Sequence, residues 1–327
     1  MRLYYLKKLF IKVGGCKILR HINKQPRVLF WHGVDNRINS KVEAEIFDVD
    51  IFEEQIIYLR KNFEIVSIEE FENRLKNKCF TNREVVLTFD DGYANNLYVV
   101  EPILRKYKLP FTVFVSTHNI ETGEFFPTSV NRIILRGAGL KEVVLPSQNL
   151  KFILETPDDI NNAECQISNL LKRLPLCNVE ILVQELIDNV SPEQWNLLQK
   201  QYHSVRPMTW LEVKELSSRE GVTIGSHCRW HICCHECQTK EDLSEQIKIS
   251  KKEIETHLEK ECRYFAYPNG NYTDYSNDIV ESVYSFGFST EMRKSIKNNS
   301  RVATIPRIGV PATLDTFKIL VNLYPKK

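Results

Sequence analysis

The chain has 327 residues, of which 43% are hydrophobic and 26% are charged, and its formal net charge at pH 7 is +2. These values are ordinary for a globular protein and leave room for one large domain or two smaller ones. The near-neutral charge argues against a nucleic-acid-binding protein, because such proteins usually carry a clearly basic domain. The nine cysteines are an odd number, which favours reduced thiols in a cytosolic protein over a disulfide framework.

Residues 1–27 form a predicted basic amphipathic arm. Residues 1–34 contain eight Lys or Arg and no Asp or Glu. Four apolar residues of the arm recur at helical spacing: Leu6, Leu9, Phe10 and Val13. Such a helix either lies on an anionic membrane surface or docks on the domain with a solvated basic face. Lysines interrupt any signal-peptide core and no stretch is long enough to span a membrane, so we expect a cytoplasmic protein that can touch the inner membrane surface peripherally.

After the arm, short β-like runs alternate with helical patterns through residues 28–327. The candidate strands are 28–31, 65–67, 85–88, 111–115, 222–226, 264–266, 286–289 and 303–305. Amphipathic helical patterns cover 50–63, 100–108 and 241–260. This alternation predicts a parallel sheet covered by helices, either open or closed into a barrel.

The region of about 118–206 breaks the alternation. It has little strand signal, and helical patterns cover 164–174, 179–190 and 191–201. Ser191 is a good N-cap, followed by Pro192 at the first helical position. We therefore predict a helical insertion that interrupts the domain and borders its cleft.

Three of the predicted strands end on polar groups. The strand at 85–88 runs into Asp90 and Asp91, the strand at 222–226 is followed by His227 and His231, and the strand at 264–266 leads into "YPNG" at 267–270. The carboxyl ends of parallel strands lie on the same side of a barrel or an open sheet. We therefore expect these segments to meet at one site.

Two imidazoles and one carboxylate form a three-ligand metal site that keeps an open position for water. A divalent cation would also relieve the repulsion between two adjacent carboxylates. One aspartate then acts as a ligand, and the other takes a proton from the water that the cation has acidified.

Other interpretations of these residues are possible. Adjacent aspartates before a glycine also serve turns. The segment "CRWHICCHEC" (228–237) would suit a structural Cys/His zinc site, although a second pair of ligands at suitable spacing is missing. Phosphatases of the haloacid dehalogenase type also end a strand on two aspartates, but they need a residue between the two, which "FDDG" lacks.

Three segments together resemble the main motifs of the polysaccharide deacetylases, the NodB-homology group within carbohydrate esterase family 4: "TFDDGY" (88–93), "IGSHCRWH" (224–231) and "RYFAYPNG" (263–270). The flanking stretches "FWHGV" (30–34), "PILRKYKLPFTVFVS" (102–116) and "MTWLEVKEL" (208–216) are similar as well. The resemblance covers about 28–120 and 205–310. It implies a distorted (β/α)7 barrel that removes the acetyl group from an N-acetylated sugar of a glycan or a lipid-linked glycan precursor.

The resemblance also implies a role for each motif position. Asp90 would be the catalytic base, and the ligands of a divalent metal, most often Zn²⁺, would be Asp91, His227 and His231. The metal and the backbone N–H of Asn269 would stabilise the oxyanion. The candidate substrate-binding residues are Tyr93, Arg263, Tyr267, Pro268 and Arg307. The two arginines among them are alternatively expected to orient Asp90.

The sequence departs from the family pattern at two places. Ile232 follows the second histidine where the family usually has proline. The family commonly offers a C-terminal histidine as general acid, but no histidine follows His257. His32 is our candidate for this acid, with a role as an orienting partner in the pocket floor as the alternative.

Two further questions stay open at the level of the sequence. Four aromatic residues are candidates either for sugar stacking or for the core: Phe125, Phe126, Trp210 and Trp230. The missing C-terminal histidine also leaves a catalytically silent carbohydrate-binding relative as the alternative function.

Overall fold

The computed structural model describes residues 2–36, 39, 41–291, 294–296 and 301–324. The predicted arm begins at residue 1, and the predicted barrel domain extends to residue 327. Residue 1 and residues 325–327 lie outside the described residues.

The centre of the molecule is a parallel sheet in the order β12-β11-β10-β9-β6-β5-β1-β13. Its strands are β1 (Arg27–Trp31), β5 (Glu84–Phe89), β6 (Phe111–Val115), β9 (Val222–Ser226), β10 (Tyr264–Ala266), β11 (Phe286–Ser289), β12 (Ile305–Pro306) and β13 (Ile308–Gly309). All residues of β5 and β6 are buried, because helices cover the outer face and packed side chains fill the inner one.

The two ends of this sheet are joined by one short stretch of chain. β12 pairs with β11 and β13 pairs with β1, and only Arg307 separates β12 from β13. The sheet therefore forms a nearly closed barrel, which confirms the predicted (β/α)7 class. The barrel is distorted beside β5, because β4 (Glu64–Ile65) pairs with the start of β5 and β6 pairs with its end.

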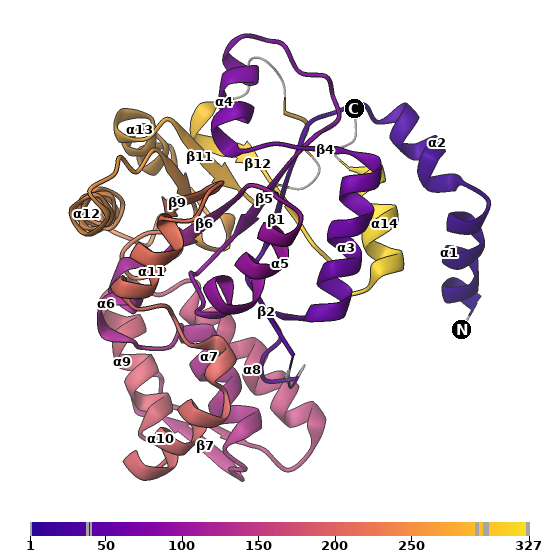
Figure 1. Cartoon of the computed structure of the whole chain (residues 1–327). Helices are drawn as coiled ribbons and strands as arrows, with labels where there is room; N and C mark the ends of the chain where they lie inside the picture. The colour runs from indigo at the N-terminus through magenta and orange to yellow at the C-terminus, as the bar shows by residue number, and fades with distance from the viewer. Residues whose placement is uncertain (1, 37–38, 40, 292–293, 297–300, 325–327) are drawn as a thin grey trace.

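Helices surround the barrel (Figure 1). They are α3 (Val49–Asn62), α4 (Ile68–Lys76), α5 (Glu101–Lys106), α11 (Trp210–Ser217), α12 (Lys240–Leu258), α13 (Asp274–Val283) and α14 (Leu314–Leu323). The helical patterns predicted at 50–63 and 241–260 are confirmed as α3 and α12, and a π-helix, η1 (Asn96–Val100), leads into α5. None of the helices in the described residues is long and apolar enough to cross a membrane.

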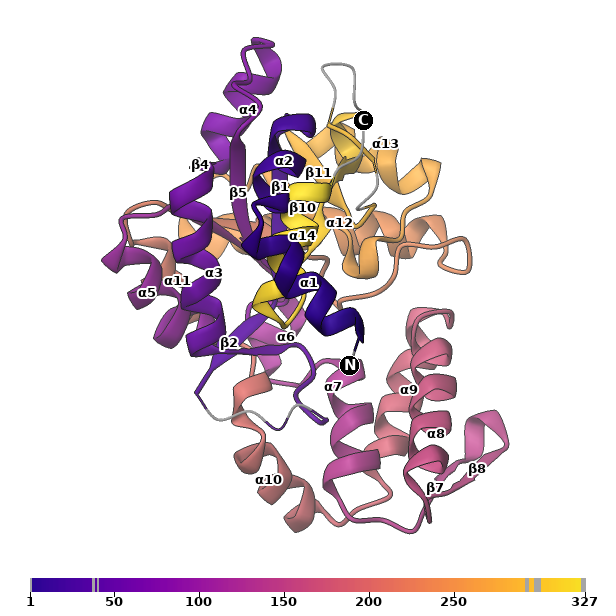
Figure 2. The ribbon, with the colours of Figure 1, turned by 90° about the vertical axis from the view of Figure 1, so that its right-hand side faces the viewer.

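The basic arm forms two helices on the outside of the barrel. α1 (Arg2–Lys12) and α2 (Gly15–Ile22) pack against α14, with the N-terminal end of α1 directed toward the insertion (Figure 2). Arg20 of α2 donates a hydrogen bond of 3.2 Å to Asn322 of α14. Several apolar side chains of the two helices and of the turn between them stay exposed: Leu6, Leu9, Phe10, Val13, Ile18 and Ile22.

The predicted insertion region lies below the barrel (Figure 2) and packs around a second hydrophobic cluster, which Val42, Ile46 and Tyr93 also join. Its helices are α6 (Thr117–Thr122), α7 (Pro127–Arg132), α8 (Pro157–Leu171), α9 (Leu176–Ile187) and α10 (Pro192–Gln201), with η2 (Ile133–Gly137) and η4 (His203–Val205). The Ser191 cap of α10 is confirmed, because its side chain accepts from the Gln194 N–H at 3.2 Å.

Several short strands differ from the prediction. The insertion contains a hairpin, β7 (Glu142–Leu145) and β8 (Leu150–Ile153), around η3 (Pro146–Gln148), and β2 (Gly33–Asp35) pairs with β3 (Ile46–Asp48). The strand predicted at 65–67 ends at Ile65, because Ser67 caps α4 instead. The strand predicted at 303–305 was also wrong. Residues Val302–Thr304 form η6, and β12 begins only at Ile305.

Candidate metal centre and active site

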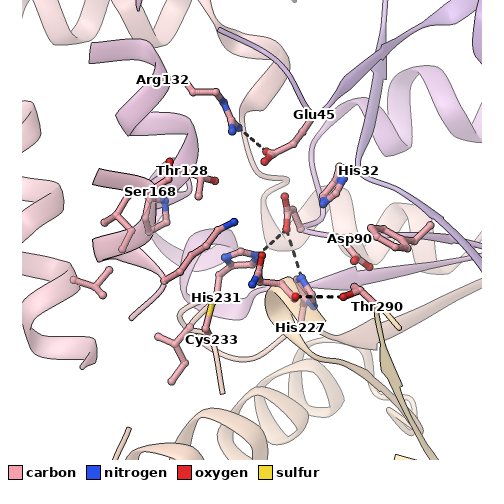
Figure 3. Close-up of a pocket in the computed structure, with 18 of the residues that line it drawn as sticks. His32, Glu45, Asp90, Thr128, Arg132, Ser168, His227, His231, Cys233 and Thr290 are labelled. Carbon is pink, nitrogen blue, oxygen red and sulfur yellow. Dashed lines mark hydrogen bonds and ion pairs between the residues drawn. The ribbon is translucent and has the colours of Figure 1, made fainter. Parts of the chain in front are cut away.

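Three potential metal ligands meet where β5 and β9 end: Asp91, His227 and His231. One ligand atom of each lies within 4.8 Å of the other two. Asp91 Oδ1 is 3.1 Å from His231 Nε2 and 3.6 Å from His227 Nε2 (Figure 3). Two ligand atoms bound at about 2.1 Å to one tetrahedral zinc ion lie roughly 3.4 Å apart, so this spacing fits a zinc-sized ion.

His227 is oriented as a metal ligand needs to be. Its Nδ1–H donates to the Ala266 carbonyl at 2.7 Å, which leaves the Nε2 lone pair facing Asp91. Burial lowers the pKa of His227 to about 4, so the ring is neutral at pH 7. A neutral imidazole is the form that binds a metal.

The other two ligands also suit a cation. The His231 ring packs edge-on to Phe126, with ring centroids 5.2 Å apart. Burial alone would lower the pKa of His231, but the carboxylate of Asp91 raises it above its ordinary value. Asp91 Oδ1 is buried and accepts no hydrogen bond of acceptable geometry among the described residues. A buried acceptor without a donor is costly, and a metal ion would satisfy it.

The adjacent carboxylate, Asp90, has a different environment. Arg307 donates two hydrogen bonds of 2.7 Å, one to each oxygen of Asp90. Burial favours the neutral acid, but Arg307 outweighs it, so the pKa of Asp90 is below its ordinary value. Asp90 is therefore an anion with a fixed direction, close to the three ligands but outside their group.

The backbone of the "DDG" turn separates the two carboxylates. The Asp90 N–H still donates to the Trp31 carbonyl at 2.9 Å, as in a continuing strand. Asp91 then adopts a φ of 70° and Gly92 a φ of 81°. Positive φ is strained for a residue other than glycine, and it turns Asp91 toward β9. His231 and Asn269 also have positive φ, so several strained residues gather at this site.

These groups line a cavity of about 300 Å³. His32 follows the end of β1 and lines this cavity together with Asp90 (Figure 3). Asp91 lines it as well. Asn269, in the turn η5 (Pro268–Gly270), lines it as well, and its carbonyl accepts from the Thr290 hydroxyl at 3.3 Å. The cavity thus brings together all residues that the sequence assigned to catalysis and to the metal.

Comparison with known proteins identifies the family of the chain. The sequence profile described as polysaccharide deacetylase matches residues 77–144 and 184–286, which together are more than half of the chain. The chain belongs to the polysaccharide deacetylase family. A search of curated proteins found no match.

Solved structures of deacetylases share the fold. The deacetylase PplD of Streptococcus pyogenes in complex with acetate superposes with a TM-score of 0.59 at 17% identity, over 92% of this chain and 99% of PplD. IcaB from Ammonifex degensii gives 0.59 at 17%, over 92% and 97% of the two chains. A de-N-acetylase from Aggregatibacter actinomycetemcomitans gives 0.54 at 17%, over 87% and 94%. At this identity, the likeness establishes the fold alone.

The candidate substrate-binding residues fall in several places. Arg307 contacts Asp90, whereas Arg263 lies before β10 and pairs with Glu72 of α4 at 2.8 Å. Tyr93 is fully buried and donates to Glu45 at 3.1 Å, and the buried Tyr267 donates to Asn277 at 2.9 Å.

The side chains of these two arginines and two tyrosines do not line the cavity around Asp90. Pro268 is buried too and begins the turn that positions Asn269.

Sequence reasoning missed one whole wall of the cavity. Glu45, before β3, pairs with Arg132 of α7 at 2.7 Å (Figure 3). Ser168 and Lys172, at the end of α8, and Val179 of α9 line the cavity as well. The predicted insertion therefore contributes directly to the cavity, in agreement with the expectation that it borders the cleft.

The four aromatic candidates separate into pairs. Phe126 is buried beside His231, and Trp210 stacks on His257 with ring centroids 4.0 Å apart, so neither lines the cavity around Asp90. Phe125 and Trp230 line a second, larger cavity beside it. Among the described residues, the potential metal ligands gather only around Asp91, and the alternative Cys/His site at 228–237 is not assembled.

Proposed function

We propose that the chain is a metal-dependent deacetylase that hydrolyses the N-acetyl group of a sugar in a glycan or a lipid-linked glycan precursor. The observation that carries this proposal is the grouping of Asp91, His227 and His231 within 4.8 Å, beside the separately held Asp90. Family membership supports the same reaction class.

The donor set suits a divalent ion, and we favour Zn²⁺, because two imidazoles and one carboxylate are typical of catalytic zinc sites. Such an ion, when bound, would acidify water and polarise the acetyl carbonyl. Asp91, His227 and His231 would hold it.

The remaining steps belong to residues of the chain. Asp90, kept ionised by Arg307, would accept the proton of the attacking water. The backbone N–H of Asn269 would donate to the oxygen that becomes negative in the transition state. His32, which also lines the cavity, would protonate the amine as the C–N bond breaks. The products are acetate and a free amino sugar.

We also propose that the protein acts in the cytoplasm, at the membrane surface. Nine cysteines, an odd number, suit a reducing cytoplasm. The exposed Leu9, Val13, Ile18 and Ile22, set among the lysines and arginines of α1 and α2, suit peripheral contact with an anionic membrane. Co-sedimentation with vesicles that contain anionic lipid, compared with neutral vesicles, tests this contact.

The decisive experiment measures acetate release from a panel of acetylated sugars, with and without a chelator. We expect release that the chelator abolishes and that Zn²⁺ restores. Asp90→Asn should lose most turnover while it still binds metal. A catalytically silent carbohydrate-binding protein would bind some of these sugars and release acetate from none, with metal present, and this result would replace our proposal.

A further inference from the structure

A second cavity of about 1010 Å³ adjoins the first. It lies between α9, the start of α10 and the chain before α7. Pro127 and Val179 line both cavities, so the two meet at these side chains. Its volume is in the range of ligand sites.

The floor of the second cavity is one face of α9. This helix is apolar on two sides. Val179, Leu182 and Leu186 are buried in the cluster that stabilises the insertion. On another side, Leu176, Val183 and Ile187 line the cavity. The polar Glu180 and Gln184 of α9 line the cavity as well. The three apolar residues are only partly buried, so they would accept an apolar ligand.

The opposite walls carry large apolar side chains, Phe125, Val130, Trp195 and Trp230. Polar side chains line the cavity between them: His118, Asn119, Asn196 and Gln199. The carboxylates that line the cavity, Glu124, Glu180 and Asp188, belong to exposed residues and therefore lie toward the solvent. The inner surface thus favours an uncharged, hydrophobic occupant.

A cation lies on the side of the first cavity that faces the second. Lys172 lines the first cavity together with Leu171 and Val179, and α8 and α9 lie side by side (Figure 2). Arg132, which also lines the first cavity, is buried and already paired with Glu45. Lys172 takes part in no ion pair within the described part of the chain. An ammonium group here suits a phosphate between the sugar and an apolar chain.

We propose that the second cavity holds the hydrocarbon chain of a lipid-linked sugar, with its phosphate near Lys172 and its acetylated sugar beside Asp90. This inference rests on the proposed deacetylase function and selects the lipid-linked precursor over a long glycan as substrate. Each methylene that enters the cavity should raise affinity by roughly fourfold.

The test compares acetate release from the methyl and the dodecyl phosphodiesters of N-acetylglucosamine. The methyl ester is too short to reach past Val179. We expect kcat/KM of the wild-type enzyme to be at least about 100-fold higher for the dodecyl ester. Ile187→Asp should reduce this ratio strongly, because it puts a charge on the cavity floor. Ile181→Asp is the matched control on the same helix, since Ile181 is 49% exposed and does not line the cavity.

Two further measurements distinguish a loss of lipid binding from a loss of folding in the variants. Quenching of tryptophan fluorescence by dodecyl phosphate should be saturable in the wild type and in Ile181→Asp, and weak in Ile187→Asp. Lys172→Gln should lower kcat/KM for the dodecyl phosphodiester more than for the uncharged dodecyl glycoside.

The outcomes separate the two proposals. Equal kcat/KM for methyl and dodecyl esters would overturn the lipid cavity and leave the deacetylase function intact. If kcat/KM rose with added sugar units instead of added methylenes, and Ile187→Asp abolished that rise, the cavity would bind a glycan. This result would also overturn the lipid cavity. Absence of acetate release from every substrate would overturn both.

Discussion

Arg307 holds Asp90 through two parallel hydrogen bonds of 2.7 Å at the point where the barrel closes. Arg307 is fully buried, and its guanidinium also packs over the rings of Phe30 and Phe114. Within the described part of the chain, the adjacent Asp91 has no arginine partner and faces two histidines instead. Two neighbouring carboxylates thus have different environments, as the proposed roles of Asp90 as base and Asp91 as metal ligand require.

The ion pair between Arg307 and Asp90 predicts how kcat/KM depends on pH in the acidic range. Asp90 accepts a proton only when it is ionised, so activity should fall as the pH drops through its pKa. Arg307 lowers that pKa, so in the wild type Asp90 should stay ionised throughout the pH range in which His227 and His231 are neutral and can hold a metal. Arg307→Met removes the charge while burial remains, and the acid limb of kcat/KM should move up by about 1 to 3 pH units.

Arg263→Met is the matched control for this profile. Arg263 pairs with Glu72 and lies away from the cavity, so its loss should leave the acid limb in place. Equal shifts in both variants would mean that Arg307 does not act through Asp90.

Metal binding should stabilise the fold measurably. Zn²⁺ at about 100 times its Kd should add about 2.7 kcal/mol to the free energy of unfolding, and raise the Tm by several degrees. Asp91→Asn should remove this gain, because it removes a ligand charge. His203→Gln, at an exposed histidine, should keep it. Thermal unfolding with zinc or with chelator is the measurement, and a gain that persists in Asp91→Asn would place the metal elsewhere.

Much of the barrel and its centre could be predicted because both are local in sequence. The apolar run of β5 is fully buried, as a strand covered on both faces should be. Asp90, Asp91 and His227 follow their strands directly, so chain direction alone places them at one end. The same rule separates the two arginines, because Arg263 precedes β10 and must lie at the opposite end of the barrel.

The rest depends on contacts between distant segments. Glu45 and Arg132 pair across 87 positions, and nothing near either residue signals the other. β2 and β3 are too short to show a period, and the hairpin of the insertion is equally brief. Arg307 closes the barrel between two strands of two residues each, which no local pattern marks.

Gly92 should be needed for both conformation and space. Its φ is 81°, and a Cβ there would lie 2.8 Å from Cγ1 of Val115. Gly123 has a similar φ of 76°, with nothing within 4 Å of its would-be Cβ. Gly123→Ala should therefore cost about 1 kcal/mol of unfolding free energy, and Gly92→Ala about 2 to 4. Urea denaturation measures both, and equal costs would show that Val115 moves aside freely.

The role of His32 can be separated from a merely structural one by the choice of leaving group. An amine must be protonated as it leaves, whereas a nitrophenolate leaves unaided. If His32 is the general acid, His32→Gln should lower kcat for an N-acetyl sugar by about 100- to 10,000-fold and for a nitrophenyl acetate ester by less than about tenfold.

Asp90→Asn is the control for this test. The base activates water for both substrates, so its loss should lower both rates together. His32→Gln would behave in the same way if the ring only supported the pocket floor between Phe30 and the carboxylates. A loss of kcat confined to the N-acetyl sugar would instead show that His32, which follows β1, supplies the proton to the leaving amine. No histidine follows His257 in the sequence to take this role.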